Sequence, residues 1–266
     1  MEGVLKTPLS YYGGKQQLAK LILGLIPEHR VYCEPFLGGA AIFFAKEPSK
    51  VEVINDTNGE LINFYEVLKR DFTALEKEVA ISLHSRKKHH QAQVIYENPE
   101  MFDRIKRAWA IWMLANSSFG GMLDSGFGYS KATGSCTKKL TNKRLNFTED
   151  YAIRLQNAQI ECCDALKIIR SRDNSEAFFY CDPPYVGSDQ GHYDGYTQDD
   201  FDNLLSLLET IKGRFLLSSF RNKALSKAAE QNGWHTIEIK MHCSMNKVGQ
   251  KVEVLTANYP IKVPRE

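Results

Sequence analysis

Four consecutive residues, Asp182-Pro183-Pro184-Tyr185, bring together a carboxylate, a rigid carbonyl and a phenol. The apolar and aromatic run before them, residues 178–181, predicts a buried strand. Because each proline lacks an N–H and has its φ fixed at about −65°, the strand must end there. Open α/β sheets place their active sites just past the carboxyl ends of their strands. The sequence therefore predicts a reactive site at this point of the chain.

The chemistry that these residues suit is activation of a planar amine as a nucleophile. Asp182 and the Pro183 carbonyl offer two acceptors at a fixed angle, which match the two N–H donors of an exocyclic amine. Acceptors that draw those N–H bonds out of the ring plane localise the lone pair for attack. Tyr185 offers a face on which a heteroaromatic ring can stack. The alternative is a strand-end turn with a capping Asp. The tyrosine and the aromatic strand favour the amine site.

An earlier part of the chain has the pattern of a nucleotide-binding unit. A strand at Val31–Glu34 leads into a glycine turn at 35–39 and then into a helix that reaches about Lys46. Glycines let a ligand approach the backbone, and the helix N-terminus favours a negative group. A second strand at 51–54 ends before Asp56, at the spacing from which an acidic residue accepts from ribose hydroxyls. A plain βαβ unit with a capping Asp is the alternative.

Three motifs in order resemble the Dam-like (D12 class) DNA adenine-N6 methyltransferases across nearly the whole chain. They are the aromatic-x-Gly-Gly-Lys stretch at 11–15, the Glu-Pro-Phe-Leu-Gly-Gly turn at 34–39 and the Asp-Pro-Pro-Tyr signature at 182–185. The resemblance implies S-adenosyl-L-methionine as the methyl donor and S-adenosyl-L-homocysteine as the product, without a metal. Ala40 stands where the family usually has glycine, and we expect it to be tolerated if its φ is negative.

The resemblance also assigns site residues. The catalytic set is Asp182, Pro183, Pro184 and Tyr185, and the predicted donor-binding set is Tyr11, Lys15, Glu34, Phe36, Gly38, Gly39, Asp56 and Asp164. Asp164 follows a strand at 159–163, and capping of the next helix is its alternative role. Residues 186–197, rich in glycine and aromatics, are interpreted as a lid over the target base.

The charge is unevenly distributed. From His84 to Phe147 eleven Lys/Arg face four Asp/Glu, a net charge of +7, so the remainder carries −5 of the overall +2. A basic segment in an acidic frame indicates a polyanion as partner, and a merely solvated basic face is the alternative. The predicted contacts to double-stranded DNA are Arg86, Lys87, Lys88, Phe127, Tyr129, Lys131, Lys138, Lys139, Lys143 and Arg144. The Dam-branch recognition pattern R-Y-N…F-N-V-P is absent, so its GATC target is not transferred.

These observations predict an α/β fold: a Rossmann-like methyltransferase sheet with a terminal hairpin, plus a mainly helical inserted DNA-recognition domain. We expect residues 1–57 and 148–266 to form the catalytic domain and 58–147 the insertion, with helices at 58–69, 72–83 and 101–116 and a long loop at 119–147. His89 and His90, being adjacent, are expected in a solvated or phosphate-facing role. The cysteines at 33, 162, 163 and 181 are expected in the core.

The composition argues against a membrane-spanning, a secreted or a zinc-binding protein. The chain has 266 residues, 43% of them hydrophobic, with no apolar run of membrane-spanning length and no Cys-x-x-Cys pair, and its first residues lack the apolar h-region of a signal peptide. We expect a cytoplasmic bacterial or phage enzyme, a monomer or weak dimer, with a cognate restriction endonuclease as a candidate partner. The alternatives are methylation of another planar amine (cytosine N4, RNA adenine or protein glutamine) or a non-catalytic DNA-binding module. The sequence does not give the recognition site.

Overall fold

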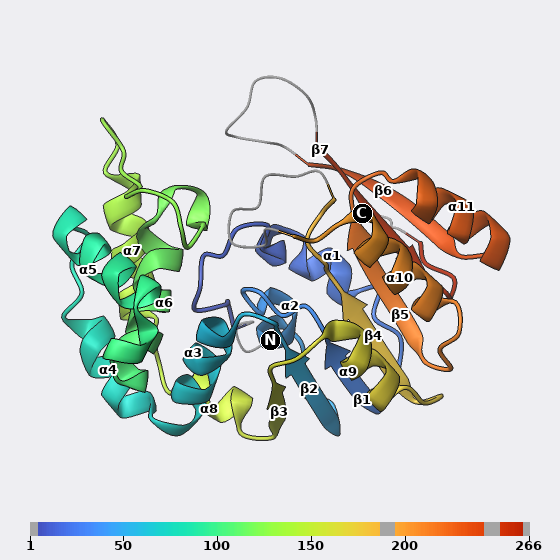
Figure 1. The fold of residues 1–266 in the computed structure, drawn as a ribbon, viewed down its shortest axis with the longest axis horizontal. Helices are drawn as coiled ribbons and strands as arrows, with labels where there is room; N and C mark the ends of the chain where they lie inside the picture. The colour runs from blue at the N-terminus through green and yellow to red at the C-terminus, as the bar shows by residue number, and fades with distance from the viewer. Residues whose placement is uncertain (1–4, 187–194, 242–250, 263–266) are drawn as a thin grey trace.

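The computed structural model describes residues 5–186, 195–241 and 251–262, and in these ranges seven strands form one sheet (Figure 1). The strands are β1 Val31–Glu34, β2 Val51–Asn55, β3 Ala158–Glu161, β4 Ala177–Cys181, β5 Arg214–Ser219, β6 His235–Met241 and β7 Lys251–Ala257. Their order is β3-β2-β1-β4-β5-β7-β6. The first five are parallel, whereas β7 runs antiparallel to both β5 and β6. The predicted sheet with its terminal hairpin is confirmed.

The strand order reverses direction between β1 and β4. The chain builds outward from β1 to β2 and β3, then returns to add β4 and β5 on the other side of β1. At such a switch point the connections diverge above and below the sheet and leave a crevice at the carboxyl ends of the strands. The glycine turn after β1 and the Asp182 stretch after β4 both open onto that crevice.

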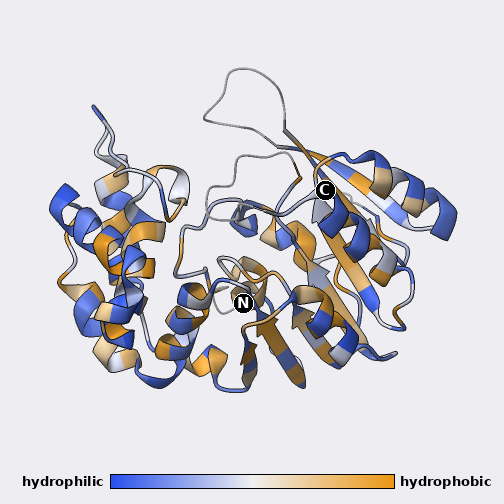
Figure 2. Ribbon diagram, in the orientation of Figure 1, coloured by the Kyte–Doolittle hydropathy of each residue, from blue (hydrophilic) through white to orange (hydrophobic). Residues whose placement is uncertain are grey.

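Both faces of the sheet are covered. Along β4, Phe178 and Tyr180 enter one apolar core, whereas Phe179 and Cys181 enter the other, as the period of two requires. One face packs on α9 Ala165–Arg172, α10 Gln198–Leu208 and α11 Lys223–Asn232, and the other on α1 Ala19–Leu23, α2 Ala41–Ala45, α3 Gly59–Arg70 and α8 Asp150–Leu155. Figure 2 shows hydrophobic colour along the strands and mixed colour on the helices around them.

A group of helices lies beside one edge of the sheet (Figure 1). It comprises α4 Phe72–Ala80, α5 Arg86–Glu97, α6 Arg104–Ser117 and α7 Ser135–Leu145, together with the short turns η2 Pro99–Met101 and η3 Phe119–Gly121. Every residue of α6 from Ala108 to Ser117 is buried, and α6 packs on α3, α4, α5 and α7. Trp109, Trp112 and Met113 are thus core residues, as their helical spacing indicates.

Two expectations about this helical part need correction. The predicted loop at 119–147 contains α7, in which Leu140 alone is buried among polar residues, so no apolar period marked the helix. His89 is neither solvated nor phosphate-facing, because it is buried and shares a hydrogen bond of 2.9 Å with the Ser118 hydroxyl.

The condition set for Ala40, a negative φ, is not met, and the expectation that Cys162 and Cys163 lie in the core is wrong. Ala40 adopts a left-handed conformation with φ of 55°, because the glycine turn must reverse there to begin α2. Cys162 is exposed and Cys163 partly exposed, since they follow β3, an edge strand whose end is open to solvent. Cys33 and Cys181 are buried as expected. Residues 187–194 of the predicted lid lie outside the described ranges.

The described residues contain neither a candidate membrane-spanning helix nor a candidate metal cluster. No helix there is both long and apolar enough to cross a bilayer. In the same ranges, no three His, Cys, Asp or Glu side chains cluster in a way that could hold a metal ion.

Candidate active site

A cavity of about 980 Å³ opens at the carboxyl edge of the sheet, between the strand ends and the helical part. All of the predicted catalytic and donor-binding residues line it: Tyr11, Lys15, Glu34, Phe36, Gly38, Gly39, Asp56, Asp164, Asp182, Pro183, Pro184 and Tyr185. They come from the ends of the four strands β1 to β4 and from the N-terminal segment, up to 174 positions apart in the chain. The volume of the cavity lies within the range of about 300–1,000 Å³ that is typical of ligand-binding pockets.

The glycine turn after β1 forms one wall of the cavity. Gly38 has a φ of 49°, and its N–H donates to Asp56 Oδ2 over 2.9 Å. The other Asp56 oxygen accepts from the Asn58 N–H, also at 2.9 Å. A Cβ at Gly39 would lie only 2.8 Å from the Tyr11 Cβ, so Tyr11 packs directly on the turn. Asp56 therefore fixes the shape of the turn, a task that its spacing alone did not indicate.

Asn55 joins the neighbouring strand ends, and sequence reasoning missed it. Its amide nitrogen donates to the carbonyls of Pro35 and Cys163, each over 2.9 Å, and its oxygen accepts from the Cys163 N–H at 3.0 Å. One buried side chain thus holds the turns after β1 and β3 in register. Asp164 caps α9 by accepting from the Lys167 N–H over 2.9 Å, and it also lines the cavity, so its predicted contact with the donor stays a prediction.

Glu34 lies buried at the end of β1 and accepts from the Tyr32 hydroxyl over 2.9 Å. Burial raises the pKa of Glu34 to about 8, and the nearby Asp182 carboxylate adds to the rise. A carboxyl with this pKa carries a proton at neutral pH, so it can donate a hydrogen bond into the cavity as well as accept one.

Asp182 stands just beyond β4, with 19% of its side chain exposed. The Lys15 ammonium lies 2.8 Å from Asp182 Oδ1, and the Tyr185 hydroxyl donates to the same oxygen at 3.2 Å. Burial raises the pKa of Asp182, Lys15 opposes that rise, and Glu253 adds to it. Asp182 is therefore a mostly buried carboxylate whose negative charge is stabilised by the Lys15 ammonium.

Glu253 and Ser218 complete this cluster, and neither was among the predicted site residues. Glu253 is buried on β7, where Oε1 accepts hydrogen bonds from the hydroxyls of Tyr185 and Ser218. The Lys15 ammonium is 3.6 Å from the same oxygen. The signal in the sequence was an acidic residue inside the apolar run 252–255, but only the fold shows which edge it faces.

Tyr185 uses its hydroxyl within the cluster rather than pointing it to solvent. Its ring packs edge-on against Phe220 with centroids 4.3 Å apart, and Lys15 Nζ lies 5.0 Å from the ring centroid. Burial raises the pKa of Tyr185, and the adjacent carboxylates of Asp182 and Glu253 raise it further. The hydroxyl therefore stays protonated and acts as a donor.

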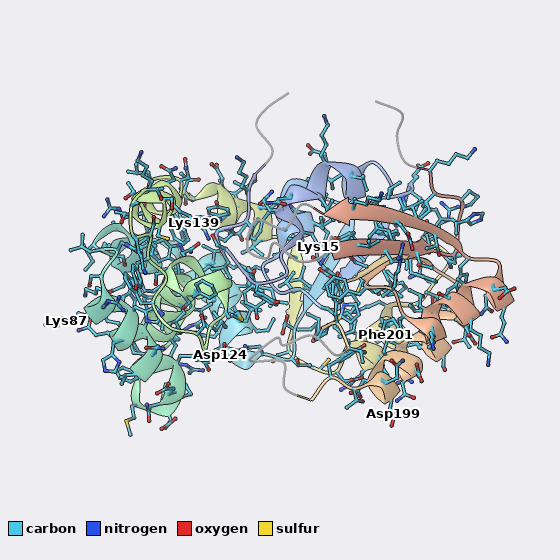
Figure 3. The ribbon with its side chains drawn as sticks, turned by 90° about the horizontal axis from the view of Figure 1, so that it is seen from above. Lys15, Lys87, Asp124, Lys139, Asp199 and Phe201 are labelled. Carbon is cyan, nitrogen blue, oxygen red and sulfur yellow. The ribbon has the colours of Figure 1, made fainter. Side chains whose placement is uncertain are left out.

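The predicted DNA contacts divide into three groups. Tyr129 and Lys139 line the cavity, and the Arg86 guanidinium stacks 4.7 Å from the Tyr129 ring and 5.3 Å from that of Phe127. The second group consists of the exposed Lys87, Lys131 and Lys138 and the partly exposed Lys88. Lys88 Nζ lies 5.7 Å from the centroid of the Trp109 ring. Figure 3 shows Lys139 nearer to Lys15, whereas Lys87 lies at the outer edge of the helical part.

The third group turns inward. Lys143 donates from Nζ to the Thr7 carbonyl, and burial lowers its pKa to about 8. Arg144 donates from Nη1 to the Ser82 carbonyl over 3.1 Å. Both side chains hold α7 against neighbouring segments, a use that a count of basic residues does not reveal.

The chain is similar in sequence to several known methyltransferases. The chain is 26% identical to the type II methyltransferase M1.LlaDCHI of Lactococcus lactis subsp. cremoris, over 93% of each chain. It is 27% identical to the DNA adenine methylase of Vibrio cholerae, over 77% of each chain, and 25% identical to that of Salmonella typhi, over 94% of each. An rRNA methylase from Streptococcus thermophilus is a distant structural neighbour, with a TM-score of 0.37 and 7% identity over 91% and 93% of the two chains.

One family description matches most of the chain. Residues 11–243 match the D12 class N6 adenine-specific DNA methyltransferases, a range that contains the glycine turn, Asp56 and the Asp182 stretch. The sheet order and the cavity at its switch point suit methyl transfer from a bound donor. The chain belongs to the D12 class of N6 adenine-specific DNA methyltransferases and is an adenine-specific DNA methyltransferase.

Proposed function

We propose that the cavity at the carboxyl edge binds S-adenosyl-L-methionine beside a flipped-out adenine of double-stranded DNA. The observation that carries this proposal is the shared cavity, in which the glycine turn and Asp182 face one space of about 980 Å³. The base must leave the duplex, at a cost of a few kcal/mol, because its amine is otherwise out of reach.

The cavity wall fits the donor. At Gly38 the positive φ exposes backbone, and at Gly39 the packing on Tyr11 leaves no room for a side chain. Such a surface lets a ligand lie against the main chain. The proposed donor-binding residues are Tyr11, Lys15, Glu34, Phe36, Gly38, Gly39, Asp56 and Asp164. When bound, the donor supplies an electrophilic methyl on a sulfonium and leaves as S-adenosyl-L-homocysteine.

The acceptors at the end of β4 hold the amine. Asp182 and the Pro183 carbonyl accept its two N–H groups, Pro184 keeps the turn rigid, and Tyr185 borders the base. The amine lone pair forms the N–C bond as the C–S bond breaks, and the bonding electrons leave with sulfur. The surplus amine proton then passes to Asp182 or to water. Positioning of the amine is the main contribution of these residues.

The insertion, residues 58–147, is proposed to grip the DNA, and residues 1–57 and 148–266 to form the catalytic domain. The contacts that we retain are those that are at least partly exposed or line the cavity: Arg86, Lys87, Lys88, Phe127, Tyr129, Lys131, Lys138 and Lys139. Cations set the register on the phosphates, and the aromatic tips contact bases. We further propose a cytoplasmic monomer or weak dimer, with a cognate restriction endonuclease as its functional partner.

The test is transfer of labelled methyl from S-adenosyl-L-methionine to unmethylated duplex DNA, followed by nucleoside analysis. We expect label in N6-methyladenine, loss of transfer in Asp182→Ala, and normal transfer in Asp199→Asn, an exposed carboxylate on α10 (Figure 3). Label in N4-methylcytosine, RNA or protein would contradict the proposed substrate. DNA binding without transfer by the wild type would instead favour a binding module.

A further inference from the structure

Lys15 lies between two carboxylates at the end of β4 and the start of β7. Its ammonium is 2.8 Å from Asp182 Oδ1 and 3.6 Å from Glu253 Oε1, and it also donates to the Gly13 carbonyl over 3.0 Å. The Lys15 and Glu253 side chains are 7% and 6% exposed. A shift of the ammonium by less than 1 Å, on the order of ordinary side-chain motion, would exchange the nearer partner.

This arrangement conflicts with the task proposed for Asp182. The same oxygen that accepts from Lys15 also accepts from the Tyr185 hydroxyl. A carboxylate paired with a cation has less negative charge to offer the amine, so its hydrogen bonds to the N–H groups are weaker. Asp182 becomes a better acceptor once Lys15 has another partner.

Glu253 is built to be that partner. It is a buried acid that accepts hydrogen bonds from the hydroxyls of Tyr185 and Ser218, and these donors fix its orientation toward the cavity. We propose that Glu253 is a positioning residue of the methyl transfer: it anchors the Tyr185 hydroxyl and takes the Lys15 ammonium from Asp182 when the adenine amine arrives. This inference rests on the function proposed above.

The titratable groups that face Asp182 determine its pKa, and thus how the exchange of Lys15 between Asp182 and Glu253 would change the pH profile. They are Lys15 from the N-terminal segment, Tyr185 after β4, Glu253 from β7, and the buried Glu34 and Tyr180 from the two central strands. Loss of the Glu253 charge removes one of the influences that raise the pKa of Asp182. If Asp182 must be ionised, the acid limb of kcat/KM then moves to lower pH.

The test uses Glu253→Gln, which keeps an acceptor oxygen for the two hydroxyls but removes the charge. We expect kcat to fall by about 10- to 100-fold, the scale on which misplacing a reacting group by about 1 Å acts. The affinity for S-adenosyl-L-methionine and the Tm should stay near the wild-type values, and the acid limb should shift to lower pH. Glu253→Asp should restore part of kcat and of the pH profile. Glu238→Gln, an exposed acid on β6, serves as the matched control.

A second measurement separates the exchange from simple packing. Lys15→Met and Glu253→Gln should be less than additive in kcat, because both act through the charge on Asp182. Full additivity, an unchanged kcat in Glu253→Gln, or a lower kcat with a lower Tm and an unmoved acid limb would each overturn the inference. A wild type that makes no N6-methyladenine would overturn the proposed function and this inference with it. A normal wild type beside an unaffected Glu253→Gln would overturn the inference alone.

Discussion

The buried charges around Glu52 on β2 are predicted to contribute strongly to stability. Glu52 is 2% exposed and accepts from Lys46 Nζ over 2.6 Å, from Arg154 Nη2 over 2.9 Å and from the Ser49 N–H over 3.1 Å. The Arg154 guanidinium also lies 3.8 Å from the Phe43 ring. Glu52→Gln leaves two buried cations without a counter-ion, so we expect a loss of about 3–5 kcal/mol.

The assay is thermal and denaturant unfolding. At roughly 2–4 °C per kcal/mol, Glu52→Gln should lower the Tm by roughly 6–20 °C. Methyl transfer well below the transition should persist, because Glu52 lies near the amino end of β2 and does not line the cavity. Glu238→Gln removes an acid from an exposed pair with Arg221 and should leave the Tm unchanged. Equal Tm values for the two variants would refute the reasoning.

The same network predicts a dependence on pH. Burial alone would raise the pKa of Glu52, but the hydrogen bond from Arg154 and the charge of Lys46 outweigh it, so the folded-state pKa is lowered. The stability that Glu52 contributes is therefore complete above its unfolded pKa of about 4.3 and is lost as the pH falls through the folded value. Wild type should lose this contribution in acid, whereas Glu52→Gln has none to lose.

Three further predictions concern the cavity and its rim. Gly39→Ala places a Cβ 2.8 Å from the Tyr11 Cβ, so calorimetry should show weaker binding of S-adenosyl-L-methionine, and unchanged affinity would contradict the proposed wall. Burial raises the pKa of Glu34 to about 8, so the free energy of unfolding of the wild type should fall as the pH rises from about 4.3 to about 8. Glu34→Gln should remove this slope in pH-dependent melting. Lys139→Ala should weaken DNA binding and reduce its salt slope by about 1, whereas exposed Lys227→Ala on α11 should leave both unchanged.

Local chemistry explains why much of the site could be predicted. The prolines after Asp182 terminate a strand whatever surrounds them, and the glycines at 38 and 39 permit a tight turn that other residues would resist. The parallel order then follows from alternating strands and helices, which brings these turns to one edge. Residues whose roles depend on neighbours close in sequence were therefore predictable.

Residues whose roles depend on distant neighbours were not. Lys143 looked like a DNA contact until the fold placed the Thr7 carbonyl beside it, 136 positions away. The sequence left the sign of φ at Ala40 open. The φ is positive although this costs a residue with a side chain about 1–2 kcal/mol, because the turn imposes the conformation on a residue whose methyl is buried. In α7, Leu140 is the single buried residue, and one apolar position defines no period.

The terminal hairpin shows how topology alone can add a residue to an active site. Because β7 runs antiparallel to β5, its first residues lie at the edge where the parallel strands end, with Ser219 paired to Val254 and Ser218 to Leu255. Glu253, one position before Val254, thus reaches the edge that holds Asp182, although 71 positions separate the two acids. A parallel strand in that place would present its last residues there instead. The hairpin is therefore part of the site's wall, and the antiparallel direction of β7 is what gives Lys15 its second carboxylate.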